Sequence, residues 1–143
     1  MEYKAYYVEE RDGIFSSSIQ SLEIPEPQDG DLLISVSYSS LNYKDALCAT
    51  GVKGVAASYP FVPGIDAVGT VAKSNSDAFH EGDKVICSGY KLGMNTNGGF
   101  GSLICVPADW VVHLPSAMSD FEAMSYGVAG LTSAACVKSI IDK

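Results

Sequence analysis

Residues 31–39 alternate between apolar and polar side chains, and this segment limits the fold more than any other part of the sequence. A two-residue period places successive side chains on opposite faces of a β-strand, so one face can be buried while the other meets water. We therefore expect a strand over Asp31–Ser39 with one apolar and one largely hydroxyl-bearing face. The apolar set is Leu32, Ile34, Val36 and Tyr38, and the other set is Leu33, Ser35, Ser37 and Ser39.

Short segments of the same kind recur along the chain, separated by turns that contain glycine or proline. No pattern of helical crossovers lies between them, which favours a mainly β, partly open barrel up to about Pro115 over βαβ repeats. The polar stretch Asn42–Gly54 is expected to be a loop that leaves the barrel. The further expected strands are Lys4–Val8, Ser17–Ile24, a bent segment over Phe61–Lys73, Lys84–Cys87 and Ser102–Val106.

The pattern changes at Ser119, where a helix is expected to begin. Ser119 and Glu122 have the S-x-x-E spacing in which a hydroxyl and a carboxylate satisfy the free amides of a helix start. We therefore expect a barrel domain over residues 1–118 and a helical segment over residues 119–143 that leads toward a domain absent from this sequence. The absent domain is expected because this helix carries an apolar stripe that requires a partner surface. The stripe consists of Leu131, Ala134, Ala135, Val137, Ile140 and Ile141.

Charge and hydropathy exclude several classes of partner. The 143 residues include 9 Lys and Arg against 17 Asp and Glu, so the net charge is -8. Because nucleic-acid binding requires a surplus of Lys and Arg on one face, we do not expect a nucleic-acid partner. No apolar run approaches the roughly 18 residues of a membrane span, and the first residues do not resemble a signal peptide. We therefore expect a cytoplasmic protein without a membrane partner.

The cysteines are not spaced as a metal site. No CxxC pair is present, and a cytosolic cysteine is commonly a small core residue. We expect buried free thiols at all four positions, which are Cys48, Cys87, Cys105 and Cys136.

Five motifs occur in the order found in the medium-chain dehydrogenase/reductase superfamily, and the chain resembles that superfamily from about Lys4 to Ile141. The NYKDAL segment of the first motif and the helix that carries TSAACV, residues 132–137, look most like the quinone oxidoreductase branch, which includes bacterial acrylyl-CoA reductases. The motifs are Leu41–Leu47 (LNYKDAL), Phe61–Val71 (FVPGIDAVGTV), Glu81–Val85 (EGDKV), Gly98–Phe100 (GGF) and Tyr126–Ser133 (YGVAGLTS).

The resemblance implies a GroES-like barrel whose C-terminal helix leads toward an absent Rossmann domain that would hold most of the cofactor, NADPH. The implied activity is reduction of an activated double bond, such as an acrylyl-CoA-like enoyl thioester, or of a quinone. The implied partner is a small-molecule substrate, and a homodimer is left open. The alternative is a stand-alone GroES-like module that catalyses nothing and docks a partner protein through the apolar stripe.

Zinc alcohol dehydrogenases of the same superfamily differ from this chain at their metal ligands. They carry a Cys at the position matching Asn42 and a His-Glu pair at the positions matching Ile65 and Asp66. An amide and an aliphatic side chain are not the ligands that catalytic zinc requires. The resemblance therefore implies a zinc-independent reductase with no metal site.

The resemblance places Asn42 and Tyr43 beside the nicotinamide. There Tyr43 would donate a hydrogen bond to the cofactor or to the substrate carbonyl, and Asn42 would hold a carboxamide or a ribose hydroxyl. Lys44 and Asp45 are ordinary loop residues in the alternative interpretation, with Asp45 capping the segment Ala46–Thr50. The proton donor is left open among Tyr43, Lys53 and solvent, because Lys53 stands where several related enoyl reductases have Tyr.

Two further polar residues match the superfamily site, and each has a structural alternative. Asp66 lies in an apolar run, where a carboxylate is costly without a partner, so it is expected either to pair with Lys44 or to act as a catalytic acid. Thr132 matches a hydroxyl that touches the nicotinamide, but it would also bond to its own helix. Residues 90–99 are expected as a mobile rim of the cleft, whereas His80, His113 and Trp110 are expected at the surface or the barrel edge.

Overall fold

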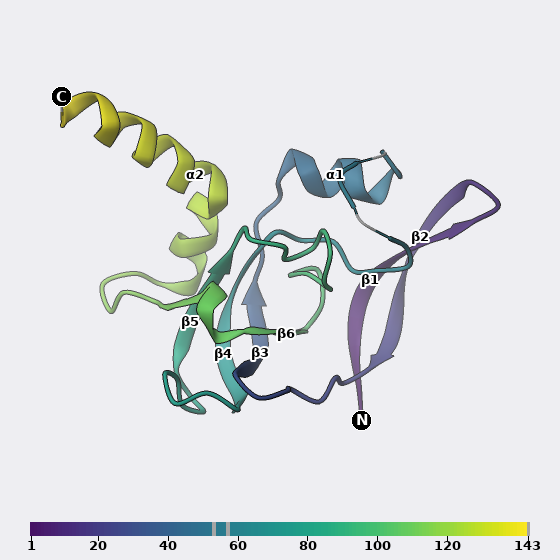
Figure 1. The fold of residues 1–143 in the computed structure, drawn as a ribbon, viewed down its shortest axis with the longest axis horizontal. Coiled ribbons are helices and arrows are strands. Elements are labelled where there is room, and N and C mark those ends of the chain that lie inside the picture. The colour runs from purple at the N-terminus through teal and green to yellow at the C-terminus, as the bar shows by residue number, and fades with distance from the viewer. Residues whose placement is uncertain (53, 57, 143) are drawn as a thin grey trace.

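The computed structural model describes residues 1–52, 54–56 and 58–142, and it contains two antiparallel β-sheets and two helices (Figure 1). One sheet pairs β1 with β2, and the other has five strands in the order β6-β3-β4-β5-β7. The mainly β fold with a C-terminal helix is therefore confirmed. The elements are β1 (Glu2–Arg11), β2 (Ile14–Glu23), β3 (Asp31–Tyr38), α1 (Tyr43–Ala49), β4 (Asp66–Ser74), β5 (Lys84–Ser88), β6 (Leu103–Pro107), a 3-10 turn (Ala108–Trp110), β7 (Val111–His113) and α2 (Asp120–Ile141).

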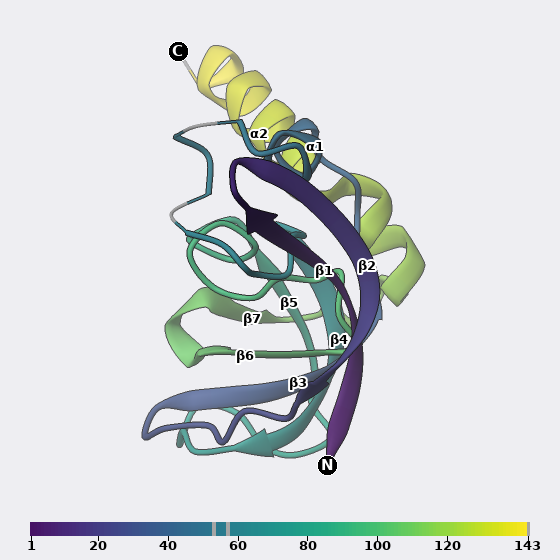
Figure 2. The same ribbon diagram turned by 90° about the vertical axis from the view of Figure 1, so that its right-hand side faces the viewer.

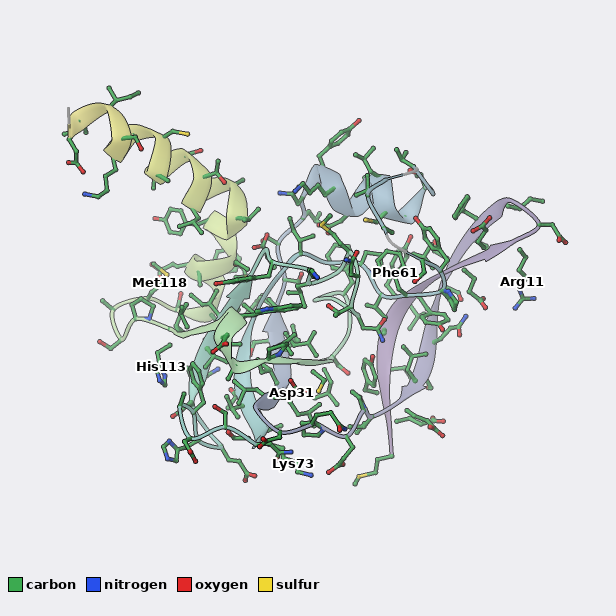
Figure 3. All side chains as sticks on the ribbon, viewed as in Figure 1. Arg11, Asp31, Phe61, Lys73, His113 and Met118 are labelled. Carbon is green, nitrogen blue, oxygen red and sulfur yellow. The ribbon has the colours of Figure 1, made fainter. Side chains whose placement is uncertain are left out.

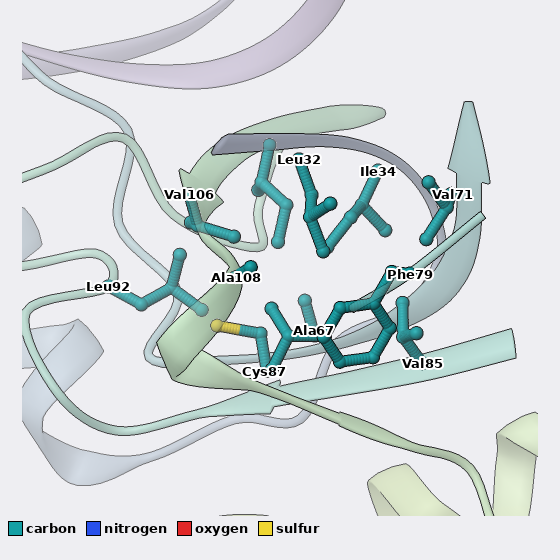
Figure 4. Packing of buried hydrophobic residues seen from close by; sticks show 12 residues of the cluster. Leu32, Ile34, Ala67, Val71, Phe79, Val85, Cys87, Leu92, Val106 and Ala108 are labelled. Carbon is teal, nitrogen blue, oxygen red and sulfur yellow. The ribbon is translucent and has the colours of Figure 1, made fainter. Parts of the chain in front are cut away.

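The five-stranded sheet curls into a partly open barrel. β6 and β7 lie at opposite edges of this sheet, yet only the short 3-10 turn joins them, so the two edges must approach each other (Figure 2). The curl encloses a core to which every strand of the sheet contributes (Figure 4). Its largest fully buried side chains include Leu32, Ile34, Ile104 and Val106.

The alternation predicted for β3 is interrupted at Leu33 and fails at the end of the strand. Leu32 and Ile34 are buried as expected, but Leu33 is also buried, and Tyr38 is 49% exposed. Tyr38 lies at the sheet end and packs edge-on against Phe121 of α2, with ring centroids 5.9 Å apart. The last apolar residue of the pattern therefore contacts the helix and not the barrel core.

β1 and β2 form a long hairpin whose backbone bridges to the rest of the chain come from β1. They pair from Glu2 opposite Glu23 to Arg11 opposite Ile14, and Arg11 marks the hairpin tip in Figure 3. β1 extends beyond its expected strand at both ends, whereas β2 begins three residues earlier than expected and ends at Glu23. Bridges join β1 to Phe61 and Gly101. Among the described residues, β2 pairs with no strand other than β1, and residues 14–22 of this outer strand carry no charge.

Three sequence predictions need correction. The stretch expected as a loop contains α1, because Asn42 and Asp45 satisfy each other's backbone amides as a capping box. The strand expected from Phe61 begins only at Asp66, because Pro63 and Gly64, with φ at 109°, interrupt the extended chain. β7 was not expected, because three residues are too few to show a period.

The cysteines are all free, but they are not all buried. Cys48 and Cys87 are buried as predicted, whereas Cys105 is half-buried and Cys136 is exposed on α2. Burial raises the pKa of the Cys87 thiol to about 12 and that of Cys105 to about 11. These two thiols are therefore protonated and unreactive at neutral pH.

α2 begins where the capping box predicted, but it is not one continuous helix. The Ser119 hydroxyl accepts from the Glu122 amide, and the Glu122 carboxylate accepts from the Ser119 amide. Gly127 has φ 52° and ψ -163°, which breaks the helix into two halves. The first half packs Ala123 and Met124 against Val68 of β4.

The second half of α2 projects away from the barrel (Figure 1). Its apolar side chains are exposed, including Leu131 at 62% and Ile140 at 75%. By length and composition, α2 is the one helix in the described part of the chain that qualifies as a membrane span, although no such run was expected from the sequence. The signal is weak because Gly127 breaks the helix and its first half packs on the sheet.

Acid is expected to loosen the start of α2. A hydrogen bond from Lys84, with a 2.6 Å Nζ–Oδ2 distance, lowers the pKa of Asp120, and hydrogen bonds from Ser119 lower the pKa of Glu122. A lowered carboxyl pKa adds stability above the unfolded-state pKa, and this stability is lost as the pH falls through the folded-state pKa. Amide exchange at residues 120–124, corrected for intrinsic rates, should therefore show falling protection from neutral pH to about pH 3. The double variant D120N/E122Q should lose most of this pH dependence, and an unchanged dependence would contradict the assignment.

Candidate active site

Asn42 stands where the chain leaves β3 and begins α1. Its Oδ1 accepts from the Lys44 amide at 3.0 Å, and its own amide donates to Asp45 Oδ2 at 2.8 Å. The side chain is half-buried. Because Oδ1 is engaged by the helix, the Nδ2 amino group is the donor that Asn42 can offer to a ligand.

Asp45 fastens α1 to the chain that enters β4. Its carboxylate is buried, and Oδ1 accepts from the amides of Gly64 at 3.2 Å and Ile65 at 3.1 Å. Burial raises the pKa of Asp45, although these hydrogen bonds oppose the shift. The capping role expected for Asp45 is therefore present, together with a tertiary link that the sequence did not show.

Asp66 begins β4 and is buried, but its partner is not the predicted one. Oδ1 accepts from the amide of Val128 in α2 at 3.0 Å. No ion pair joins Asp66 to Lys44, which is exposed, among the ion pairs of the described residues. The expected Lys44 pairing is wrong because a backbone amide at the helix break supplies the hydrogen bond.

The break in α2 is pressed against the end of β3 and the start of β4. A Cβ at Gly127 would lie 2.4 Å from Ser40 Oγ and 3.0 Å from Asp66 Oδ2. Ser39 Oγ donates to the Asp66 carbonyl at 2.7 Å. The junction between barrel and helix therefore requires glycine, both for its positive φ and for space.

A cleft of about 420 Å³ opens at this junction. It brings together two of the four predicted site residues, Asn42 and Asp66, with Ser39, Ser40 and Tyr126, which sequence reasoning missed. Tyr43 is 77% exposed and Thr132 donates to the Val128 carbonyl at 2.8 Å, and neither lines the cleft. Ser39 and Ser40 directly follow β3, and this pair of hydroxyls was the sequence feature that could have predicted this wall of the cleft.

A second hollow, of about 510 Å³, lies on the other side of the break and shares Tyr126 and Gly127 with the cleft. Trp110 and Tyr90 line it and stack with ring centroids 5.7 Å apart and planes at 4°. Met118, labelled in Figure 3, also lines it. Trp110, in the 3-10 turn between the edge strands β6 and β7, is half-buried at the barrel edge as expected, and it also lines this hollow.

The two histidines and Lys53 are the remaining residues that the sequence singled out. His113 is at the barrel edge as expected, in contact with Phe79, and His80 is exposed. Lys53, one of the expected proton donors, lies outside the described residues. In the described ranges, no group of three or more His, Cys, Asp or Glu side chains is arranged to hold a metal ion.

Residues 28–116 match the family of alcohol dehydrogenase GroES-like domains. This chain belongs to that family. The "Probable acrylyl-CoA reductase AcuI" of Escherichia coli is 38% identical to the GroES-like domain described here, over 97% of this chain and 43% of its own length. The "Putative quinone oxidoreductase YhfP" of Bacillus subtilis is 48% identical over 78% of this chain and 33% of its own length.

Solved structures show the same relationship for this GroES-like domain. The yhdH oxidoreductase of Salmonella enterica in complex with NADP has a TM-score of 0.91 at 40% identity, covering 97% of this chain and 43% of that chain. The Bacillus subtilis YhfP structure with NAD bound has a TM-score of 0.93 at 37% identity, covering 99% of this chain and 43% of that chain. The resemblance to the quinone oxidoreductase and acrylyl-CoA reductase branch is confirmed, and the chain spans less than half the length of these relatives.

Proposed function

We propose that this chain is the N-terminal barrel part of an NADPH-dependent reductase that acts on an activated double bond, such as an acrylyl-CoA-like enoyl thioester, or on a quinone. The observation that carries the proposal is the cleft of about 420 Å³ in which the end of β3, the start of β4 and the break in α2 meet. The relatives of this domain carry the names "Probable acrylyl-CoA reductase" and "Putative quinone oxidoreductase". The division at residue 118 and the cytoplasmic location stay predictions.

The cleft residues fit a nicotinamide. Leu41, Met124 and Ala129 supply apolar walls for a flat ring, and Asn42 Nδ2 supplies a donor for a carboxamide oxygen. The Ser40 hydroxyl is a second donor, since its described hydrogen-bond partner is the thioether of Met124 at 4.0 Å, a weak acceptor. Thr132 would reach the cofactor only by giving up its bond to Val128.

NADPH, when bound, would supply the hydride, and the chain would position and polarise the acceptor. Tyr43 is the first residue of α1, directly after Asn42, and its phenol is exposed. We assign to this phenol the hydrogen bond to the substrate carbonyl oxygen, where negative charge develops as hydride reaches the double bond. The stacked pair Tyr90 and Trp110 would form an apolar wall for the rest of the acceptor.

Replacing Tyr43 with Phe should lower kcat by roughly 100-fold, because one donor to the developing oxyanion is lost. The measurement is NADPH oxidation by the full-length protein with acrylyl-CoA, crotonyl-CoA and a simple quinone as acceptors. Tyr7→Phe, on β1, is the matched control and should leave kcat unchanged. Equal kinetics for Tyr43→Phe and wild type would remove Tyr43 from the site, and no reduction of any acceptor would favour the stand-alone interaction module.

Chelation is expected to leave the activity unchanged. Asn42 and the buried Ile65 occupy positions where zinc enzymes of the superfamily carry ligands, and neither side chain binds zinc well. The full-length protein should therefore keep its rate of NADPH oxidation after prolonged treatment with EDTA. A loss of rate that added zinc restores would count against a zinc-independent reaction.

A further inference from the structure

We propose that Asp66 is a positioning residue whose carboxylate fixes the direction in which the second half of α2 leaves the barrel. The width of the cleft then depends on this bond. The link to the cleft rests on the proposed function, whereas the link between Asp66 and α2 is a property of the chain itself.

The bond meets a need created by the helix break. After Gly127 the helix restarts, and the first amides of a helix have no acceptor within it. Asp66 Oδ1 supplies an acceptor for the Val128 amide from 62 residues away in sequence. Asp66 therefore acts as an N-cap for the second half of α2, in the manner of a local Asp cap but from another element.

The Asp66 carboxylate is held by the central strand of the five-stranded sheet. β4 is the central strand of the five-stranded sheet, Asp66 pairs with Ser88 of β5, and the Asp66 carbonyl accepts from Ser39. Asp66 is only 1% exposed, so its backbone and side chain have little freedom to move. The position of Oδ1 is thus set by the sheet.

The helix depends on this contact because it has few others after the break. Its first half is anchored by Ala123 and Met124, but from Leu131 onward the described side chains are exposed. Gly127 lets the chain approach Ser40 and Asp66 without a Cβ in the way. Loss of the Asp66 bond would therefore leave the second half free to change its angle to the barrel.

The angle matters for the cleft, since Ala129 of the second half and Asn42 of the barrel line it together. A displacement of about 1 Å between reacting groups can cost on the order of 100-fold in rate. An Asp66 that acts by positioning needs only a hydrogen-bond acceptor, whereas a catalytic acid must carry a proton. Asn separates the two roles because it keeps an acceptor oxygen and cannot act as an acid.

The test compares Asp66→Asn and Asp66→Ala in the full-length protein. We expect Asp66→Ala to increase hydrogen exchange in residues 126–132 and to raise KM for NADPH on the order of 10-fold, with a smaller change in kcat. Asp66→Asn should keep hydrogen exchange in residues 126–132 and KM for NADPH close to the wild-type values, and it should keep the wild-type pH profile of kcat. Failure of Asn to rescue, with a lost limb of the pH profile and unchanged exchange, would overturn the proposal and favour a catalytic acid.

A second variant covers the case in which Asp66→Ala does not fold. Gly127→Ala keeps the carboxylate but pushes a methyl group toward Ser40 and Asp66. It should also raise exchange in residues 126–132 and KM for NADPH, and unchanged values would contradict the positioning role. If no acceptor is reduced by the wild-type protein, the proposed activity fails, and the exchange comparison alone still decides whether Asp66 holds the helix.

Discussion

Replacing Asp45 with Ala is expected to lower the free energy of unfolding by about 3–5 kcal/mol. The substitution removes the acceptor for the amides of Gly64 and Ile65, both of which are buried, and for the amide of Asn42 at the helix start. Each buried donor left without a partner costs roughly 1–3 kcal/mol. Urea unfolding of residues 1–143, followed by circular dichroism, measures the loss.

Asp45→Asn is the matched control because it keeps one acceptor oxygen at nearly the same place. It should lose less than half of what Asp45→Ala loses. Since burial raises the pKa of Asp45, its carboxyl adds stability that is complete below the unfolded-state pKa and is lost as the pH rises through the folded-state value. The advantage of wild type over Asp45→Asn should therefore shrink as the pH rises through the acid range, and a growing advantage would refute this reasoning.

Gly64→Ala should cost about 3–5 kcal/mol, because a strained backbone and a steric clash act together. Gly64 has φ 109°, and a Cβ there would lie 2.6 Å from the Phe100 amide nitrogen and 2.7 Å from that of Gly99. These are backbone atoms that cannot rotate away. The Gly99 amide also donates to the Gly64 carbonyl at 2.8 Å, so relief of the clash would break the contact that closes this side of the barrel.

Gly82→Ala separates the two contributions. Gly82 has φ 95°, but nothing lies within 4 Å of its added Cβ. It should lose only about 1–2 kcal/mol, the cost of a left-handed backbone for a residue with a side chain. Equal losses at Gly64 and Gly82, measured by the same urea unfolding, would show that the backbone contact with Phe100 contributes nothing.

Local patterns in the sequence were sufficient for most of the barrel and for the start of α2. The buried Leu32 and Ile34 of β3 follow from alternation, and the capping box at Ser119 follows from a three-residue spacing. α1 was missed because its cap, Asn42 with Asp45, uses residue types that are equally common in loops. Sequence patterns do not predict a short helix or strand that is stabilised mainly by tertiary contacts.

The site was harder to predict than the fold because its bonds join distant segments. Asn42 and Asp66 were expected together and do share a cleft, but the partner of Asp66 was not visible. A buried carboxylate in an apolar run demands a donor, and sequence offers Lys44 as readily as any other residue. Only the folded chain shows that the break at Gly127 brings the Val128 amide to the carboxylate.

The outer strand of the hairpin has a consequence for handling the protein. Within the part of the chain that the structure describes, β2 presents an unpaired edge whose residues 14–22 carry no charge, with Ile14 and Ile19 largely exposed. Such an edge is a template on which a strand from another molecule can add, and natural sheets commonly guard it with lysine. A lysine at the exposed Ser21 should therefore slow precipitation in concentrated samples without disturbing the barrel.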